Sequence, residues 1–206
     1  MPRRYRMKTR STAVGETKER IIRAAKELHA TQGMQGTSYV EIADKAGVAM
    51  ATVYRHFPSL ADLIPTCASS IIVFQPLNPD SIAVMFQGQV QPLPRLEWVI
   101  RGTCECYERD GGWLQAARRE GDLIPSLSEI VEEQQKSLRT VVRVALDGTG
   151  VTERHVQVLA ALMDFPLWKS LRDMGLTPSE ATDQVLELAR DYLEKENLTY
   201  KHGPKV

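Results

Sequence analysis

The 206-residue sequence has few cysteines and no long hydrophobic run, and both shortages limit what it can be. Three cysteines, Cys67, Cys104 and Cys106, are too few and odd in number for a disulfide framework, which favours a reducing compartment. The apolar stretches fall far short of the roughly 20 residues that a membrane-spanning helix needs. The basic start is not followed by the apolar stretch of a secretion signal. We therefore expect a cytoplasmic protein with no membrane partner.

The motifs of common enzyme and metal sites are also missing. The sequence has no glycine-rich phosphate loop, no HExxH and no GxSxG, and its four histidines are scattered. Cys104 and Cys106 lie two positions apart on an expected helix, so they face different ways, and no second Cys or His pair has zinc-finger spacing. We expect no enzyme activity, no metal and no cofactor, and we interpret the thiols as small buried hydrophobic groups.

Strand patterns are nearly absent too, because apolar residues recur every three or four positions instead of alternating. The sequence therefore predicts an all-α fold, with helix ends marked by capping residues and glycines. Residues 75–94 hold four of the eleven prolines and are expected to form an irregular connection with a short helix near 82–86. Pro65 and Pro166 are expected to bend the helices that contain them. The expected helices cover residues 17–31, 38–46 and 50–56, a stretch from Leu60, and residues 95–109, 113–119, 127–146, 153–174 and 179–195.

Charge is balanced overall but unevenly distributed along the chain. Residues 1–62 hold eleven Lys or Arg against six Asp or Glu, a net charge of +5, so the remainder carries −5. A basic first third on an acidic remainder favours a phosphate-facing module joined to a part that does not contact phosphate. For residues 1–10 alone, a solvated charge run at the terminus is an equally good explanation.

The most informative segment is EIADKAGVAMATVYRHF, residues 41–57. Its apolar positions would pack two short helices steeply against the helix before them, and Ala43 and Gly47 are small where those helices must approach. This pattern is typical of a helix-turn-helix, whose second helix must project far enough to enter the major groove of DNA. The apolar positions are Ile42, Ala43, Ala46, Val48, Val53 and Phe57.

The segment from Thr17 to Leu63 resembles the DNA-binding domain of the TetR family of bacterial repressors. The resemblance rests on the helix TKERIIRAAKELHATQG, the segment TSYVEIADKAGV, the block ATVYRHF and the following SLADL, within 47 of the 206 residues. It implies a basic flexible tail (1–14), a three-helix helix-turn-helix domain (15–62), and an antiparallel helical domain (63–206) that binds a ligand and dimerises. The function it implies is a ligand-responsive repressor that leaves a palindromic DNA operator when a small-molecule effector binds.

The resemblance also implies which residues contact DNA. The first turn of the recognition helix would face the groove with Ala49, Met50, Ala51 and Thr52. Phosphate contacts would come from Tyr54, His56, and Thr37 or Ser38, and Arg55 would contact a guanine or a further phosphate. Alternatively, Tyr54 and His56 only cover the core of the small domain. The basic residues Arg3, Arg4, Arg6, Lys8 and Arg10 either reach into the neighbouring minor groove or have no binding role.

Two further sets of residues are assigned to the second domain. A homodimer is expected, since one helix-turn-helix covers only half of a palindromic site, although a monomer could bury the same apolar stripes internally. The expected dimer stripes are Val156, Leu159, Ala160, Met163, Leu167 and Leu171 on one segment and Val185, Leu188, Ala189 and Tyr192 on another. A candidate effector pocket, or else ordinary core, is formed by Met85, Phe86, Trp98, Cys104, Tyr107, Trp113, Met163, Phe165 and Trp168.

One alternative function stays open. Because the expected recognition helix is rather apolar, the chain could be a helical interaction module of the same fold without specific DNA binding. A salt-dependent gel shift with a palindromic operator would separate the two.

Overall fold

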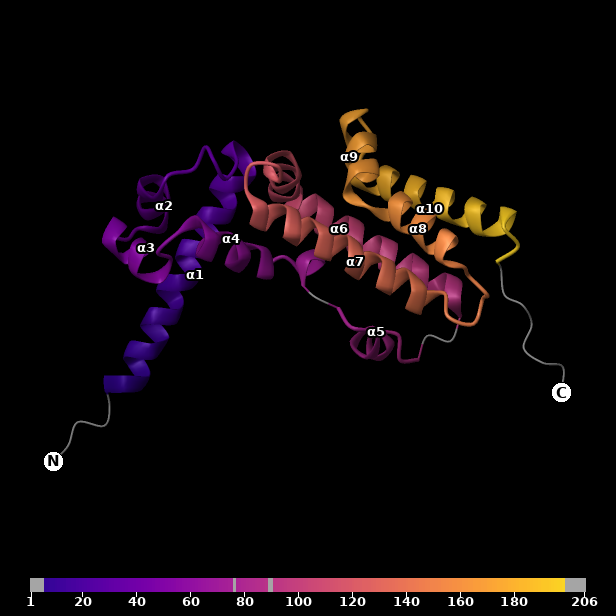
Figure 1. Cartoon of the computed structure of the whole chain (residues 1–206), viewed down its shortest axis with the longest axis horizontal. Coiled ribbons are helices and arrows are strands. Elements are labelled where there is room, and N and C mark those ends of the chain that lie inside the picture. The colour runs from indigo at the N-terminus through magenta and orange to yellow at the C-terminus, as the bar shows by residue number, and fades with distance from the viewer. Residues whose placement is uncertain (1–5, 76, 89–90, 199–206) are drawn as a thin grey trace. The chain divides into compact units, whose positions relative to one another are not determined.

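The computed structural model describes residues 6–75, 77–88 and 91–198, and every regular element among them is helical (Figure 1). The prediction of an all-α fold is confirmed. In chain order the elements are α1 (Arg6–Gln32), α2 (Tyr39–Ala46), α3 (Met50–His56), α4 (Leu60–Ser69), the 3-10 turn η1 (Ile72–Phe74), α5 (Pro79–Met85), α6 (Pro92–Glu120), α7 (Pro125–Ala145), α8 (Glu153–Met163), α9 (Phe165–Asp173) and α10 (Pro178–Lys195).

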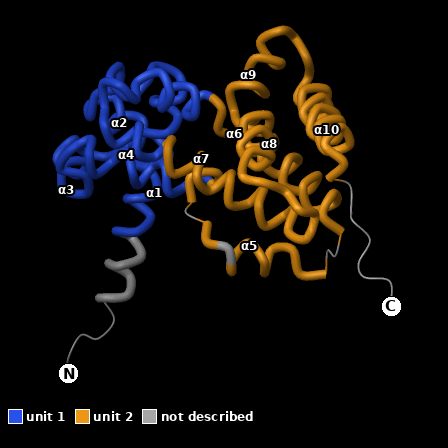
Figure 2. Tube along the Cα trace, turned by 45° about the vertical axis from the view of Figure 1, so that its right-hand side comes forward, with its two compact units in different colours: residues 1–71, 112–130 blue, residues 72–111, 131–206 orange. Residues whose placement is uncertain are grey.

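The chain forms two compact units, shown in different colours in Figure 2. The first comprises residues 1–71 and 112–130, and the second comprises 72–111 and 131–206. Helices α6 and α7 each contribute residues to both units. Each unit is therefore built from two separate stretches of chain, which differs from the expected division at residue 62.

The first unit has an apolar core that holds α1 to α4 together. Val48, which was also expected in this core, is only half-buried. Each large side chain that is buried contributes about 1.5–3 kcal/mol to stability. The buried members include Ile21 and Ala25 of α1, Ile42, Ala43 and Ala46 of α2, Val53 of α3, Phe57, and Leu63, Ile64 and Cys67 of α4.

Local capping sets the ends of α2 and the start of α10. Glu41 accepts the backbone N–H of Ser38 at 2.8 Å, while the Ser38 hydroxyl accepts the N–H of Glu41 at 3.2 Å. Gly47 closes α2 in the left-handed conformation with φ 63°, which glycine adopts without strain. Thr177 and Glu180 form the same reciprocal pair before α10. These helix ends were predicted correctly because their signals lie within four residues of one another.

The carboxylate of Glu120, at the end of α6, forms a hydrogen bond to the loop that follows α1. Glu120 is 6% exposed, accepts the backbone N–H of Gln35 at 2.9 Å and pairs with Arg119 at 2.8 Å. Gly33 makes room for it, since a Cβ there would overlap the carboxylate. Burial opposes ionisation of Glu120, but these hydrogen bonds outweigh it and lower the pKa of Glu120 below its usual value.

Helix α1 begins at Arg6, well before the expected start at Thr17. Residues 6–14 are therefore helical, not a flexible tail, and residues 1–5 lie outside the described residues. No apolar stripe marks this first part of α1, but it contains no proline, and Arg, Lys and Met favour helix.

The expected break at Gly111 and Gly112 is wrong, because α6 runs through both. Gly112 serves packing within the first unit: a Cβ there would lie 2.8 Å from the backbone oxygen of Ala30. A glycine in a helix costs about 1 kcal/mol relative to alanine, so this close contact, and not a helix end, accounts for its position.

The segment expected as one bent helix over 153–174 is instead two helices, α8 and α9. Asp164 separates them in an extended conformation (φ −75°, ψ 155°), and its carboxylate accepts the N–H of Phe165 at 2.8 Å. Pro166 lies in the first turn of α9, where its missing N–H needs no partner, but it could not continue the helix before it.

Two smaller differences concern helix starts. Helix α7 begins at Pro125, two residues before the expected start at Leu127. Residues 75–94 are more regular than expected among their described members, since α5 covers Pro79–Met85 and α6 already begins at Pro92.

All three thiols are free and buried. Burial raises the pKa of Cys67 to about 12 and that of Cys104 to about 11, and it also raises the pKa of Cys106. The three therefore behave as small apolar groups, in accord with their interpretation from the sequence.

Candidate nucleic-acid interface

Helix α3 is fixed to the core by one face and exposes the others. Val53 and the following Phe57 are buried, whereas Met50 is 47% exposed and Tyr54 is 49% exposed. Thr52 and His56 are half-buried, and the remaining predicted contact residues Ala49, Ala51 and Arg55 are exposed. The predicted recognition helix thus presents its first turn and one flank to solvent.

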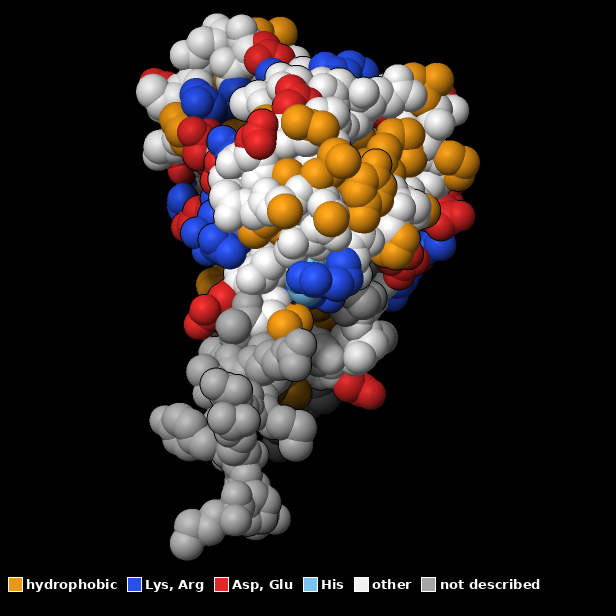
Figure 3. Space-filling model, turned by 90° about the vertical axis from the view of Figure 1, so that its left-hand side faces the viewer, with side chains coloured by type: hydrophobic (Ala, Val, Ile, Leu, Met, Phe, Trp, Pro, Cys, Tyr) orange, Lys and Arg blue, Asp and Glu red, His pale blue; other side chains and the backbone are white. Residues whose placement is uncertain are grey.

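On the α1 side, α3 borders a hollow of about 360 Å³. Arg20 of α1 and Arg55 of α3 both line it, and both are exposed. Phosphate oxygens accept hydrogen bonds from guanidinium groups, threonine hydroxyls and histidine rings, and all three kinds of group line this hollow. Figure 3 shows Lys or Arg side chains beside a histidine at this end of the first unit. The lining residues are Val14, Thr17, Arg20, Val48, Ala49, Thr52, Arg55 and His56.

Thr17 and Arg20 were not identified as contact residues from the sequence. They lie three positions apart, so they share a face of α1, and that spacing was the available signal. Because neither belongs to the helix-turn-helix segment itself, only the hollow that they line together with residues of α3 makes them candidates. Lys18 lies between them in the sequence and sits 5.7 Å from the centre of the Phe57 ring.

On the other side of α3, Tyr54 packs against Tyr39 of α2, with ring centres 4.7 Å apart and an angle of 51° between the rings. Burial, followed by the nearby Tyr54 and Asp62, raises the pKa of Tyr39 to about 12. Tyr39 therefore stays uncharged at neutral pH.

The two residues before α2 differ in availability. Thr37 is only 7% exposed, and its hydroxyl donates to the Gly33 carbonyl at 2.6 Å, so the expected phosphate contact by its side chain is not supported. Ser38 is exposed, although its hydroxyl also takes part in the cap of α2. Of the basic tail, Arg3 and Arg4 lie outside the described residues, and residues 6–10 belong to the first turns of α1.

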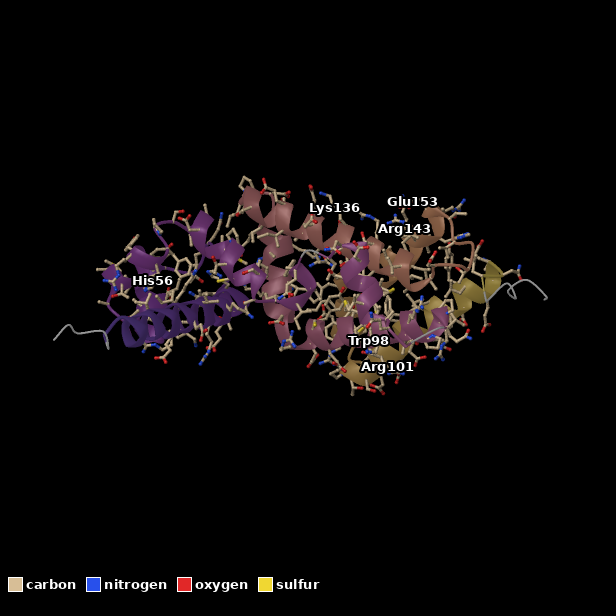
Figure 4. The ribbon with its side chains drawn as sticks, turned by 90° about the horizontal axis from the view of Figure 1, so that it is seen from below. His56, Trp98, Arg101, Lys136, Arg143 and Glu153 are labelled. Atoms are coloured by element: carbon tan, nitrogen blue, oxygen red, sulfur yellow. The ribbon has the colours of Figure 1, made fainter. Side chains whose placement is uncertain are left out.

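The second unit contains a cavity of about 300 Å³. Two residues of the predicted pocket line it, Met85 and Trp98, and Trp98 is 45% exposed (labelled in Figure 4). The side chains are mostly apolar, with Glu105, Arg109 and Gln134 as the larger polar groups. The other lining residues are Ile72, Val73, Leu77, Val99, Gly102, Thr103, Cys106, Ser137, Leu138 and Val141.

The rest of the predicted pocket belongs to the packed interior. Phe86 is buried with its ring centre 6.0 Å from that of Trp98, while Trp113 lies in the first unit. Cys104 does not line this cavity, because it lies on the opposite side of α6 from the residues that do, at 98, 99, 102, 103, 105, 106 and 109. Tyr107, Phe165 and Trp168 form an aromatic cluster, and the Tyr107 hydroxyl donates to the Met163 carbonyl at 3.0 Å.

The predicted dimer stripes are only partly available. Six of their members are buried within the second unit, where α8 packs against α10, so the chain itself already covers them. Helical periodicity identifies an apolar face but not whether the chain itself or a second copy covers it. The buried members are Val156, Leu159, Ala160, Met163 and Val185; Ala189 of the α10 stripe is buried as well, whereas Leu167, Leu171, Leu188 and Tyr192 are half-buried.

Surface ion pairs join neighbouring helices of the second unit. Arg143 and Glu153, side by side in Figure 4, are linked at 2.6 Å where α7 leads into α8. Glu97 of α6 accepts from Arg101 at 3.1 Å and from Arg190 of α10 at 2.9 Å. Such exposed pairs contribute about 0–1 kcal/mol each, so the apolar core and not these charges holds the unit together.

A short, capped helix followed by an exposed helix beside a basic hollow defines the first unit as a helix-turn-helix DNA-binding domain. The chain thus combines a helix-turn-helix domain with an additional helical unit.

Comparison with known proteins identifies the family. Residues 21–66 match the family described as "Bacterial regulatory proteins, tetR family". This segment therefore matches the DNA-binding domain of the TetR family, as its resemblance to that family predicted. No curated protein matches the chain in sequence.

Solved structures share its fold over nearly their whole length. A TetR transcription regulator from Haloarcula marismortui has a TM-score of 0.69 at 17% identity, covering 88% of this chain and 98% of that one. A transcriptional regulator from Rhodococcus sp. Rha1 has a TM-score of 0.66 at 20% identity, with 86% and 96% covered. One from Aquifex aeolicus VF5 has a TM-score of 0.62 at 18% identity, with 84% and 98% covered. At these identities the similarity establishes the fold alone.

Within residues 6–75, 77–88 and 91–198, no group of three or more His, Cys, Asp or Glu could hold a metal ion. None of the helices in the described part of the chain is both long and apolar enough to cross a membrane.

Proposed function

We propose that the protein is a homodimeric repressor that binds a palindromic operator and releases it when a small molecule binds. The observation that carries the proposal is the exposed first turn of α3 next to a hollow lined by Arg20 and Arg55. This arrangement provides groove-facing side chains and phosphate-facing cations on one domain, which is what operator binding requires.

A dimer follows from the size of the DNA contact. One recognition helix reads only a half-site, and two helices about 34–36 Å apart match one turn of DNA. The half-buried apolar residues Leu167, Leu171, Leu188 and Tyr192 are the candidates for the dimer contact, since they are the predicted interface residues that the chain's own second unit leaves partly uncovered.

The cavity of the second unit is the proposed effector site. Its mostly apolar lining favours an organic molecule with a large apolar part, and its volume of about 300 Å³ suits a small one. An effector that binds better to the conformation with the wrong spacing of the two recognition helices would release the operator by shifting the population.

The DNA-binding part is tested with the full-length protein and a pool of random-sequence duplexes, from which bound sequences are enriched over several rounds. Arg20→Ala and Arg55→Ala should weaken binding to every duplex alike, and each should reduce the slope of log K against log salt by about 1. Arg23→Ala is the matched control, because Arg23 is an exposed arginine of α1 that does not line the hollow. Enrichment of no sequence would favour the alternative, an interaction module without specific DNA binding.

The effector site is tested by filling it. Gly102 lines the cavity, and a Cβ there meets no atom within 4 Å, so Gly102→Leu adds a side chain without a clash. The fluorescence of the neutral dye N-phenyl-1-naphthylamine should rise with wild type and with Gly102→Ala, and much less with Gly102→Leu. Equal dye binding by all three proteins would rule out this cavity as the site.

A further inference from the structure

The solvent-facing surface of α3 has two parts of different chemistry. Ala49, Thr52 and Arg55 face the hollow beside α1, whereas Met50, Ala51 and Tyr54 lie outside that hollow. We call the second group the apolar face of α3. Figure 3 shows apolar side chains gathered in one area at this end of the unit, next to the basic and histidine side chains.

The apolar face has almost no means of hydrogen bonding to a base. Guanine and adenine are usually read by Arg, Lys, Asn or Gln, which can form two hydrogen bonds to a purine edge. None of these residue types occurs among positions 49–54, and Arg55, the one long cation of α3, lines the hollow with Arg20. In that hollow Arg55 is placed for a phosphate, which carries no sequence information.

Only one group on the major-groove edges of the four bases is apolar, namely the 5-methyl group of thymine. We infer that the apolar face of α3 selects its operator through thymine methyl groups, with Met50 as the main contact. The adjoining Arg20 and Arg55 supply the charge complementarity that brings this face onto DNA instead of onto another apolar surface. The inference rests on the proposed operator binding and adds the kind of sequence that is read.

Met50 is suited to this role by its shape and its exposure. Its flexible thioether chain is 47% exposed and can adapt to methyl groups on neighbouring base pairs. Ala51 is too short to prevent a close approach of the helix. Removing one buried methyl group from such a contact should weaken binding about fourfold.

The test uses the best duplex enriched from the random pool, prepared once with thymine and once with uracil, which lacks only the methyl group. For wild-type protein we expect affinity to fall about fourfold for each contacted thymine, and little change for uracil placed only in the flanks. Restoring the methyl group by 5-methylcytosine, where a C·G pair replaces the contacted T·A pair, should recover part of the affinity lost with plain cytosine.

The role of Met50 is tested by a double-mutant cycle. Met50→Ala should bind the thymine duplex more weakly than wild type does. When uracil replaces thymine, however, the affinity of Met50→Ala should fall much less than that of wild type. Val40→Ala is the matched control, since Val40 is a similarly exposed apolar residue on α2 and should leave the uracil effect unchanged.

The outcomes separate this inference from the proposed function. Enriched sequences whose binding is unaffected by uracil would overturn the inference while leaving operator binding intact. A uracil effect of equal size in Met50→Ala and wild type would also overturn it, because the methyl groups would then act through the shape of the DNA. If no sequence is enriched, operator binding itself fails.

Discussion

At the scale of single residues, the first unit buries two ionisable side chains close to each other. His29 is fully buried, and neither of its ring nitrogens has a hydrogen-bond partner in the protein. Burial lowers the pKa of His29 to about 4, although the charge of Glu120 acts in the opposite direction. Glu120, by contrast, is stabilised as a carboxylate by Gln35 and Arg119. The two groups should therefore respond to acid in different pH ranges.

His29 should make the protein less stable in mild acid. Because its pKa is lower in the folded than in the unfolded protein, its contribution is complete above pH 6.5 and is lost as the pH falls toward 4. A difference of this size corresponds to about 3 kcal/mol in the free energy of unfolding. Urea unfolding at several pH values should show that acid lowers the free energy of unfolding less for His29→Leu than for wild type. An NMR titration in which His29 protonates near pH 6.5 would contradict the prediction without any variant.

Glu120→Gln should destabilise the protein most at neutral pH. The lowered pKa of Glu120 means that its contribution is present above its ordinary pKa and is lost as the pH falls through the lowered value. At pH 7 the loss of charged hydrogen bonds should cost about 1.5–3 kcal/mol in the free energy of unfolding. The gap between variant and wild type should narrow at pH 3, and a gap of constant size would refute this explanation.

At the scale of helices, sequence signals were reliable where they are local. The ends of α2 and the start of α10 follow from caps and a glycine within a few residues. The continuity of α6 and the division between α8 and α9 could not be predicted from such local signals. In α6, Gly112 makes a close contact with Ala30 of α1, and this contact joins residues far apart in the chain.

Alanine substitutions at two glycines of α6 should change the stability of the protein in opposite directions. At Gly102 a Cβ meets no atom within 4 Å, so Gly102→Ala should stabilise the protein by about 1 kcal/mol through helix propensity. At Gly112 a Cβ would lie 2.8 Å from the Ala30 backbone oxygen, so Gly112→Ala should destabilise it despite the same gain in propensity. Thermal unfolding of both variants provides the measurement. Equal stabilisation by both would show that α1 and α6 do not pack as closely as described.

At the scale of the whole molecule, the helix-turn-helix domain and the all-helical fold were predictable, but the composition of the two units was not. The exposed residues of α3 were identified from the sequence, since its buried Val53 and Phe57 fix which sides remain free. The contribution of α1 to the basic hollow and the burial of six predicted interface residues depend on packing between distant segments. Local periodicity does not contain that information.

A charge at the proposed dimer surface should separate the subunits. Leu188 of α10 is half-buried, so Leu188→Glu should be tolerated by the fold but disfavoured in an apolar contact with a second copy. We expect sedimentation to show monomers and operator affinity to fall at least tenfold. Leu123→Glu is the control, since Leu123 is an exposed leucine of the first unit. A dimer that persists in Leu188→Glu would place the interface elsewhere.

The burial of all three thiols has a practical consequence for spectroscopy. Because buried thiols with raised pKa values form little thiolate, they should react slowly with maleimides in the folded protein. A single cysteine introduced at an exposed position could then carry a spin label or fluorophore without removal of the native ones. Cys106 is the informative exception, since it also lines the cavity of the second unit. Its slow alkylation, followed by mass spectrometry, should become slower still when a molecule occupies that cavity.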